Sequence, residues 1–197
     1  NVRPSNRTKT EIACHAKGCY SLFQVAMTII DIGGQDNKII KLGPDGRRID
    51  FRMNRKCAAG TGAFLEEMAV RLDLSLKDMD PLARQSENMV ELGSFCTVFS
   101  ATEVLEHIRR GKKIQDLVKG IFHSMLKRIL EMDSLQGTVV MTGGVVAHNP
   151  FLAEMAGLMT GREILVPEFP QLTGAFGAAL YAFEEANSLT GFRPPPE

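Results

Sequence analysis

The chain has 197 residues, of which 44% are apolar, enough for one compact domain or two small lobes with a buried core. Its 23 basic and 23 acidic residues give a formal net charge of zero, so charge offers no basis for binding nucleic acid or an anionic membrane. The sequence shows neither the roughly 20-residue apolar stretch of a membrane helix nor a secretory signal. We therefore expect a cytoplasmic protein without nucleic-acid or membrane partners.

The first quarter of the chain changes from a helical to a strand-like pattern. Its first ten residues are charged and poorly patterned, and the next segment has the apolar spacing of a helix with Gly18 as a stop signal. Three apolar, β-branched runs follow, separated by glycine-containing turns. We expect one helix and then a three-stranded antiparallel meander, over residues 10–23, 25–32, 38–42 and 49–53.

From residue 60 onward the apolar spacing is mostly helical. Residues 61–72 place apolar side chains on one stripe, and residues 114–132 repeat that stripe for about five turns. The last predicted helix carries small residues that permit close backbone approach. We expect helices at 61–72, 101–111, 114–132, 150–161 and 171–186, and strands at 137–142 and 162–167. We divide the chain into three parts. Residues 1–27 form an N-terminal segment with a remnant of a first lobe, residues 28–187 form the core, and residues 188–197 form a mobile tail.

A strand followed by two glycines occurs twice. Gly33 and Gly34 follow Ile32, and Gly143 and Gly144 follow a second apolar run. This recurrence favours two facing lobes. Glycine turns expose backbone N–H groups that can approach phosphate oxygens. One such turn alone fits a simple hairpin better than a phosphate site, and the second shifts the interpretation towards a nucleotide cleft.

Polar residues beside these turns extend that interpretation. Asp31 and Asp36 flank the first glycine pair and are the kind of ligand that holds a hydrated Mg²⁺ ion together with substrate phosphates. His148 lies in the second turn, where it either contacts a ligand or caps the turn. The sequence thus predicts a magnesium and nucleotide site at the strand ends.

The four cysteines fall into two groups. Cys57 and Cys96 lie in polar loops shortly before predicted helices, whose N-termini stabilise thiolates, although buried inert thiols are the common alternative. Two thiolates are half of a Cys₄ site, which a second chain would complete. Cys14 and Cys19 bracket His15 with a spacing that no standard zinc pattern matches. We expect these two to pack within a helix.

Five ordered motifs resemble one known family: IDIGGQDNK, NRKCAAGTGAFLEE, FCTVFSATEV, VVMTGGVVAHNP and PQLTGAFGAALYA. They are similar to the BadF/BadG/BcrA/BcrD-type ATPases, which include activators of 2-hydroxyacyl-CoA dehydratases and ATP-binding subunits of benzoyl-CoA reductases. The resemblance covers residues 11–186. It implies an α/β fold of the actin, sugar kinase and Hsp70 ATPase type, built of ribonuclease H-like lobes. We expect the chain to lack part of the N-terminal lobe, including the family's first phosphate segment.

The resemblance also implies roles for individual residues. Cys57 and Cys96 would be ligands of one 4Fe–4S cluster that bridges two subunits. The cofactors would be this cluster, ATP or ADP, and Mg²⁺. In the second phosphate segment, the resemblance implies catalytic roles for Asp31, Gln35 and Asp36 and nucleotide contacts for Gly33 and Gly34. In the adenosine segment, it implies nucleotide contacts for Gly143 and Gly144.

The implied function is ATP-dependent transfer of a low-potential electron to an iron–sulfur partner, either a dehydratase or a reductase. The subunit would form a homodimer or pair with a related subunit. Ala101 stands where dehydratase activators commonly have an acidic residue, and this favours a reductase-type member. Two alternatives from other classes are a small-molecule kinase of the same fold and a non-catalytic nucleotide-sensing module.

Overall fold

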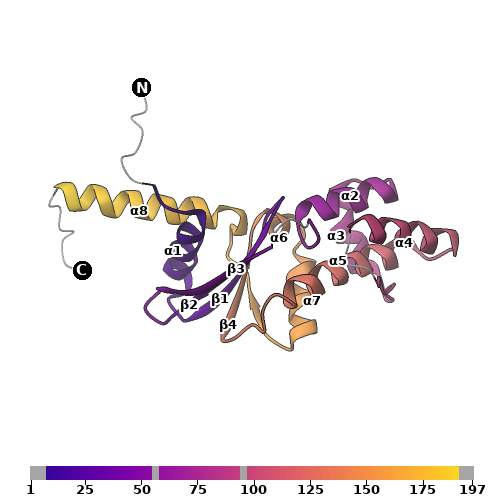
Figure 1. Ribbon diagram of the computed structural model, residues 1–197, viewed down its shortest axis with the longest axis horizontal. Helices are drawn as coiled ribbons and strands as arrows, with labels where there is room; N and C mark the ends of the chain where they lie inside the picture. The colour runs from indigo at the N-terminus through magenta and orange to yellow at the C-terminus, as the bar shows by residue number, and fades with distance from the viewer. Residues whose placement is uncertain (1–7, 55–57, 94–96, 191–197) are drawn as a thin grey trace, which may run out of the picture.

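The computed structural model describes residues 8–54, 58–93 and 97–190. Its centre is a five-stranded mixed sheet in the order β3-β2-β1-β4-β5 (Figure 1). The first three strands form an antiparallel meander, while β4 pairs in parallel with β1, and β5 in parallel with β4. The meander predicted at 28–53 is confirmed. The strands are β1 (Met27–Ile32), β2 (Asn37–Leu42), β3 (Arg48–Met53), β4 (Thr138–Thr142) and β5 (Ile164–Leu165).

Helix α1 (Glu11–Phe23) covers one face of the sheet, and α8 (Thr173–Thr190) packs across α1 (Figure 1). Side chains alternate along β1, so Ile29 packs in the cluster under α1 while Ile30 packs in the larger cluster on the opposite face. Both clusters combine aliphatic and aromatic side chains. The helices therefore bury the two faces of the sheet separately.

Most helices lie on the second face. The stripe predicted for α2 is buried as expected, through Phe64, Leu65, Met68, Ala69 and Leu72. Helix α3 was not anticipated, and its buried side packs against α5 and α7. The elements after β3 are α2 (Gly62–Leu72), α3 (Leu76–Gln85), α4 (Thr97–Arg109), α5 (Ile114–Leu130), α6 (Gly144–His148), α7 (Phe151–Thr160) and the short 3₁₀ helix η1 (Pro170–Leu172).

Glycines bring α1 and α8 into close contact. A Cβ atom on Gly18 would lie 2.2 Å from the Thr173 carbonyl oxygen, and one on Gly177 would lie 1.8 Å from the carbonyl oxygen of Cys14. The stop predicted at Gly18 is wrong, because this glycine lies within α1 and admits the backbone of α8. The small residues of α8 do permit close approach, as predicted. Helix α8 runs to Thr190, three residues into the segment predicted as a tail.

The two strand–glycine motifs belong to one sheet. Asp31 and Thr142 are register partners in the parallel strands β1 and β4, and each strand ends in a glycine pair. Parallel neighbours end at the same sheet edge. The interpretation of the recurrence as two facing lobes is therefore wrong, since the repeat marks two adjacent strand ends.

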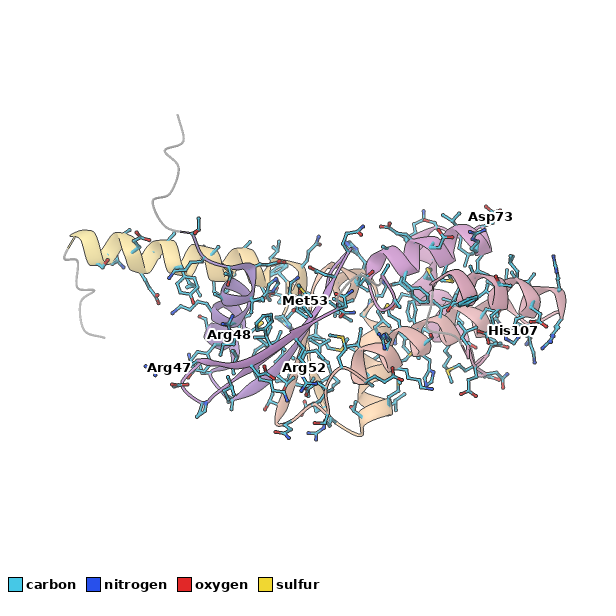
Figure 2. The ribbon with its side chains drawn as sticks, viewed as in Figure 1. Arg47, Arg48, Arg52, Met53, Asp73 and His107 are labelled. Atoms are coloured by element: carbon cyan, nitrogen blue, oxygen red, sulfur yellow. The ribbon has the colours of Figure 1, made fainter. Side chains whose placement is uncertain are left out.

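Strand β3 forms an edge of the sheet and is exposed along its length. Figure 2 shows Arg48, Arg52 and Met53 along it. The guanidinium of Arg52 lies 3.4 Å from a carboxylate oxygen of Asp133. Charged side chains of this kind protect an edge strand from pairing with another chain. None of the helices in the described part of the chain is long and apolar enough to cross a membrane.

Candidate functional site

Asp31 occupies the centre of a polar row across three strands. Its register partners are Lys38 in β2 and Thr142 in β4. The Thr142 hydroxyl donates to Asp31 Oδ1 at 3.0 Å, and Lys38 Nζ lies 3.5 Å from Asp31 Oδ2. Lys38 also donates to Asp36 Oδ1 at 2.7 Å. The two aspartates predicted to hold magnesium are thus joined through one lysine.

Helix α1 adds two side chains to this row. Glu11 Oε1 lies 3.2 Å from Lys38 Nζ, and His15 Nδ1 lies 3.7 Å from Asp31 Oδ1. The same His15 nitrogen is 3.0 Å from the Thr173 hydroxyl at the start of α8. The row therefore links the sheet to both helices of its first face.

Burial alone would lower the pKa of Lys38, but its hydrogen bonds and charge contacts with Asp36, Asp31 and Glu11 raise that pKa above the ordinary value. The lysine thus stays charged at neutral pH. Three carboxylates surround this single ammonium, which leaves an excess of negative charge that suits a divalent cation bound largely through water. The donor set fits Mg²⁺ in charge and in oxygen chemistry.

Lys38 and His15 were not predicted to be part of this site. A signal for Lys38 was available, because it shares a face of β2 with Ile40 and Leu42, which pack under α1. A lysine on a buried strand face requires a carboxylate partner. His15 offered no comparable signal, since its contacts with Asp31 and Thr173 come from other elements of the fold.

The first glycine pair forms a turn that contacts α2. The Gly33 N–H donates to the Asp36 carbonyl at 2.9 Å. The carbonyl oxygens of Gly33 and Gly34 accept from the N–H groups of Gly62 and Ala63, at 2.9 and 2.7 Å. Gly34 itself is exposed, and a Cβ atom placed on it would meet nothing within 4 Å. The turn is held from behind by α2 and is open in front.

The second glycine pair requires glycine at its first position. Gly143 has φ +100°, and a Cβ atom on it would lie 2.3 Å from the Ile32 carbonyl oxygen. Its N–H donates to the Pro170 carbonyl at 2.9 Å. Gly144 then begins α6. The end of β1 and the start of α6 are thereby brought close together.

A cavity of about 640 Å³ lies between these two turns. Its size is typical of small-molecule sites. Gly34, Gly62 and Gly144 line it together with His148, whereas Asp31, Gln35 and Asp36 are not among the described residues that do so. The cavity is therefore lined both by Gly34, from the predicted phosphate segment, and by Gly144, from the predicted adenosine segment.

Polar side chains that sequence analysis did not name also line this cavity. Asn149 is 6% exposed, and its Nδ2 donates to the Val145 carbonyl at 2.9 Å. Its Oδ1 has no hydrogen-bond partner among the described residues. A buried acceptor in this condition favours a ligand that brings a donor. The other polar side chains of the lining are Glu66, Ser75, Lys77 and Gln171.

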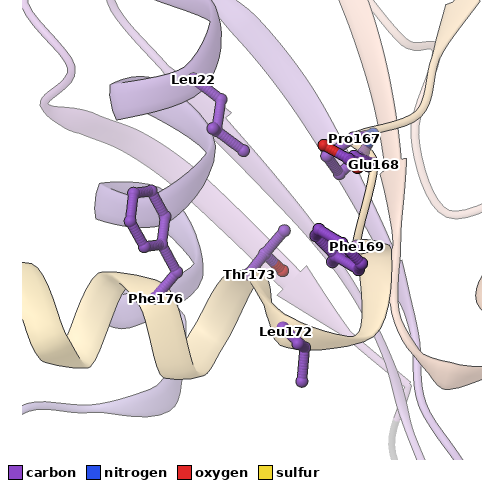
Figure 3. A pocket seen from close by; sticks show the side chains of 7 residues that line it. All are labelled: Leu22, Pro167, Glu168, Phe169, Leu172, Thr173 and Phe176. Carbon is purple, nitrogen blue, oxygen red and sulfur yellow. The ribbon is translucent and has the colours of Figure 1, made fainter.

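A smaller hollow of about 280 Å³ lies beside the start of α8 (Figure 3). Figure 3 shows Leu22 and Phe176 on one side and Phe169 and Leu172 on the other. Its walls are mainly apolar, with few groups that could orient phosphates. It does not suit a nucleotide.

Cys57 and Cys96 lie outside the described residues. The helices that follow them in sequence, α2 and α4, pack against each other. Cys14 and Cys19 are buried free thiols, and their predicted packing role is confirmed. Burial is the main reason that the pKa of Cys19 is raised to about 12, and burial also raises that of Cys14.

Comparison with known proteins identifies close relatives. The chain is 43% identical over 189 residues to the 2-hydroxyisocaproyl-CoA dehydratase activator of Clostridioides difficile, covering 94% of this chain and 71% of the relative. It is 38% identical to the (R)-2-hydroxyglutaryl-CoA dehydratase activating ATPase of Acidaminococcus fermentans, covering 92% and 70% of the two chains.

A solved structure of the Clostridium difficile 2-hydroxyisocaproyl-CoA dehydratase activator, with bound ADPNP, superposes with a TM-score of 0.89 at 41% identity. The superposition covers 100% of this chain and 75% of that one. The predicted α/β fold of the actin, sugar kinase and Hsp70 ATPase type is confirmed. A model of the BadF/BadG/BcrA/BcrD ATPase family matches residues 3–182, and the chain belongs to this family.

Proposed function

We propose that this protein is an ATP-hydrolysing activator that passes a low-potential electron to a 2-hydroxyacyl-CoA dehydratase. The observation that carries the proposal is the cavity onto which the Gly34 and Gly144 turns both open. Family membership and the dehydratase activators among the relatives support this reaction class. The cytoplasm of an anaerobic cell is the setting that this chemistry requires.

The nucleotide would occupy this cavity. Its phosphates would approach the exposed Gly34, and its adenosine would lie along Gly144 and Asn149. Asp31 and Asp36 would hold Mg²⁺ through water beside the phosphates, with Lys38 fixing both carboxylates. Gln35, exposed at the tip of the turn, would orient the attacking water.

Cys57 and Cys96 would each supply one thiolate to a 4Fe–4S cluster, and an identical or related subunit would supply the other two. Such a cluster, when bound, supplies one-electron transfer at low potential. The described residues link the Gly33–Asp36 turn to α2, because the N–H groups of Gly62 and Ala63 at the start of α2 donate to the carbonyls of Gly33 and Gly34.

Ala101 does not distinguish a dehydratase activator from a reductase subunit. The residue is 7% exposed within the core that α4 helps to close. Alanine at such a position is explained by packing, because a carboxylate there would be buried without water. We therefore base the choice of partner on the dehydratase activators among the relatives.

Iron analysis tests this proposal. The full-length protein and its Cys57→Ala, Cys96→Ala and Cys14→Ala variants are purified anaerobically, and iron and acid-labile sulfide are counted per chain. We expect about two iron atoms per chain, the content of one four-iron cluster per two chains. The Cys57→Ala and Cys96→Ala variants should each lose this iron, whereas Cys14→Ala should keep it.

Absence of iron from the wild-type protein, even after reconstitution, would contradict the proposal. ATP turnover would then separate the two alternatives. A kinase requires a phosphate acceptor for turnover, and a sensor binds nucleotide without turnover.

A further inference from the structure

We propose that Asn37 is a positioning residue that couples nucleotide occupancy at the Gly33–Asp36 turn to the start of α2. This inference rests on the proposed function, because it takes the turn to be a phosphate contact. It assigns the coupling to one buried amide side chain that follows the turn directly.

Asn37 is bonded to both sides of the connection between β3 and α2. Its N–H donates to Asn54 Oδ1 at 2.8 Å, and its carbonyl accepts from the Asn54 N–H at 3.2 Å. Its side-chain Nδ2 donates to the Gly60 carbonyl at 3.1 Å. Asn37 is 1% exposed, so these bonds are shielded from water. One residue thus holds both flanks of the connection in which Cys57 lies.

On the α2 side of this connection, Gly60 lies close to Asn37. Gly60 has φ +87°, and a Cβ atom on it would lie 2.8 Å from Asn37 Nδ2. A side chain at this position would push the amide away and strain the backbone. The approach of Gly60 to Asn37 therefore depends on glycine.

A second set of bonds reaches the turn from the start of α2, directly after this connection. Gly62 and Ala63 donate to the carbonyls of Gly33 and Gly34. A Cβ atom on Gly62 would lie 3.0 Å from Gly34 Cα and 3.2 Å from Val145 Cγ2. The turn, Asn37 and the start of α2 therefore form one closely packed hydrogen-bonded unit.

A ligand that orders the exposed Gly34 should also order the start of α2, because the two share these bonds. Coupling needs a ligand that stabilises one arrangement of the unit more than others. Asn37 would transmit this effect by holding residues 58–61 against the turn. Without its side chain, the turn could bind phosphate while the start of α2 opens independently.

Hydrogen exchange measures this coupling directly. The full-length wild-type protein, Asn37→Ser and a matched Asn88→Ser control on an exposed residue are compared with and without ADPNP and Mg²⁺. The readout is the ratio of amide exchange rates in the two states, in peptides covering residues 58–65. A purely structural role would change exchange in both states and leave this ratio unchanged.

In the wild type and in Asn88→Ser, we expect the nucleotide to slow exchange at 58–65 by roughly fivefold or more, the lower range of measured coupling between sites. In Asn37→Ser this slowing should fall below about twofold, while the Kd for ADPNP stays within about threefold of the wild-type value. The affinity should change little because the bound phosphates contact the turn, and Asn37 lies behind it.

Three results would overturn the inference. Asn37→Ser could keep the full nucleotide-dependent slowing, or it could lose nucleotide binding itself, which would place Asn37 in the binding site. Loss of coupling in Asn88→Ser as well would show that the effect is not specific. If Asn37→Ser does not fold, Gly60→Ala, whose Cβ atom would lie 2.8 Å from Asn37 Nδ2 and push that amide away, is held to the same expectations. A wild type that binds no ADPNP would instead refute the proposed function and this inference with it.

Discussion

Gly143 and Ile32 are in close backbone contact where β4 and β1 end, and a Cβ atom on Gly143 would lie 2.3 Å from the Ile32 carbonyl oxygen. The contact fixes the distance between the end of β1 and the start of α6. Because the turns after β1 and β4 both line the cavity, this distance also sets its width. Any side chain at Gly143 would have to separate the two strand ends.

Gly143→Ala should therefore destabilise the protein strongly. The left-handed φ costs a residue with a Cβ atom about 1–2 kcal/mol, and the overlap with Ile32 adds about 1–3 kcal/mol. Gly161→Ala is the matched control, because Gly161 has φ +65° but open space around its Cβ position. We expect the control to lose only about 1 kcal/mol. Urea unfolding would contradict this view if the two variants lost equal stability.

Lys38→Met should lower the free energy of unfolding by about 3–5 kcal/mol, because it leaves the buried Asp31 carboxylate without its cation. Lys41→Met on the same strand is the control. Lys41 pairs with Asp133, which keeps a contact with Arg52 when the lysine is removed. The control should lose about 1 kcal/mol. Chemical denaturation at pH 7 measures both, and a smaller loss for Lys38→Met than for Lys41→Met would show that Asp31 does not depend on the lysine.

The raised pKa of Cys19 predicts a stability that falls at alkaline pH. The thiol has an ordinary pKa of 9.0 and a folded pKa of about 12, with burial as the main cause. A raised folded pKa gives stability that is fully present below pH 9 and is lost as the pH rises from 9 towards 12. Cys19→Ala should therefore lose less stability than the wild type between pH 8 and about pH 10.5. Parallel pH profiles of the two proteins would refute the assignment.

Local patterns in the sequence predicted most elements correctly. The meander and the stripe of α2 could be predicted because their apolar periodicity is visible within a short stretch of sequence. Helix α3 was missed because Leu76–Gln85 is strongly charged and contains Pro81, which usually breaks a helix, although its buried residues Met79 and Ala83 lie on one helical face. Its contacts with α5 and α7 come from residues far along the chain, which no local pattern reveals.

Long-range relationships were predicted less well. The glycine pairs were found, but their placement in one sheet depends on the parallel pairing of β1 with β4, which are more than 100 residues apart. The glycine at Gly18 looked like a helix end because the helix that requires it is α8, far along the chain. The polar row around Asp31 was only partly identified, since His15 reaches it from α1 and the local signal at Lys38 was overlooked.

The contact between α1 and α8 also bears on how the chain is made. Helix α8 begins about 150 residues after α1 ends, and a ribosome that adds about 5–20 residues per second needs roughly 8–30 seconds to cover that interval. During this time the small-residue side of α1 has no partner, and Gly18 faces solvent where the backbone of α8 will later lie. The first helix of the structure therefore reaches its final environment only after α8 has been synthesised. A nascent chain released early would expose this surface to chaperones or to other unfinished chains.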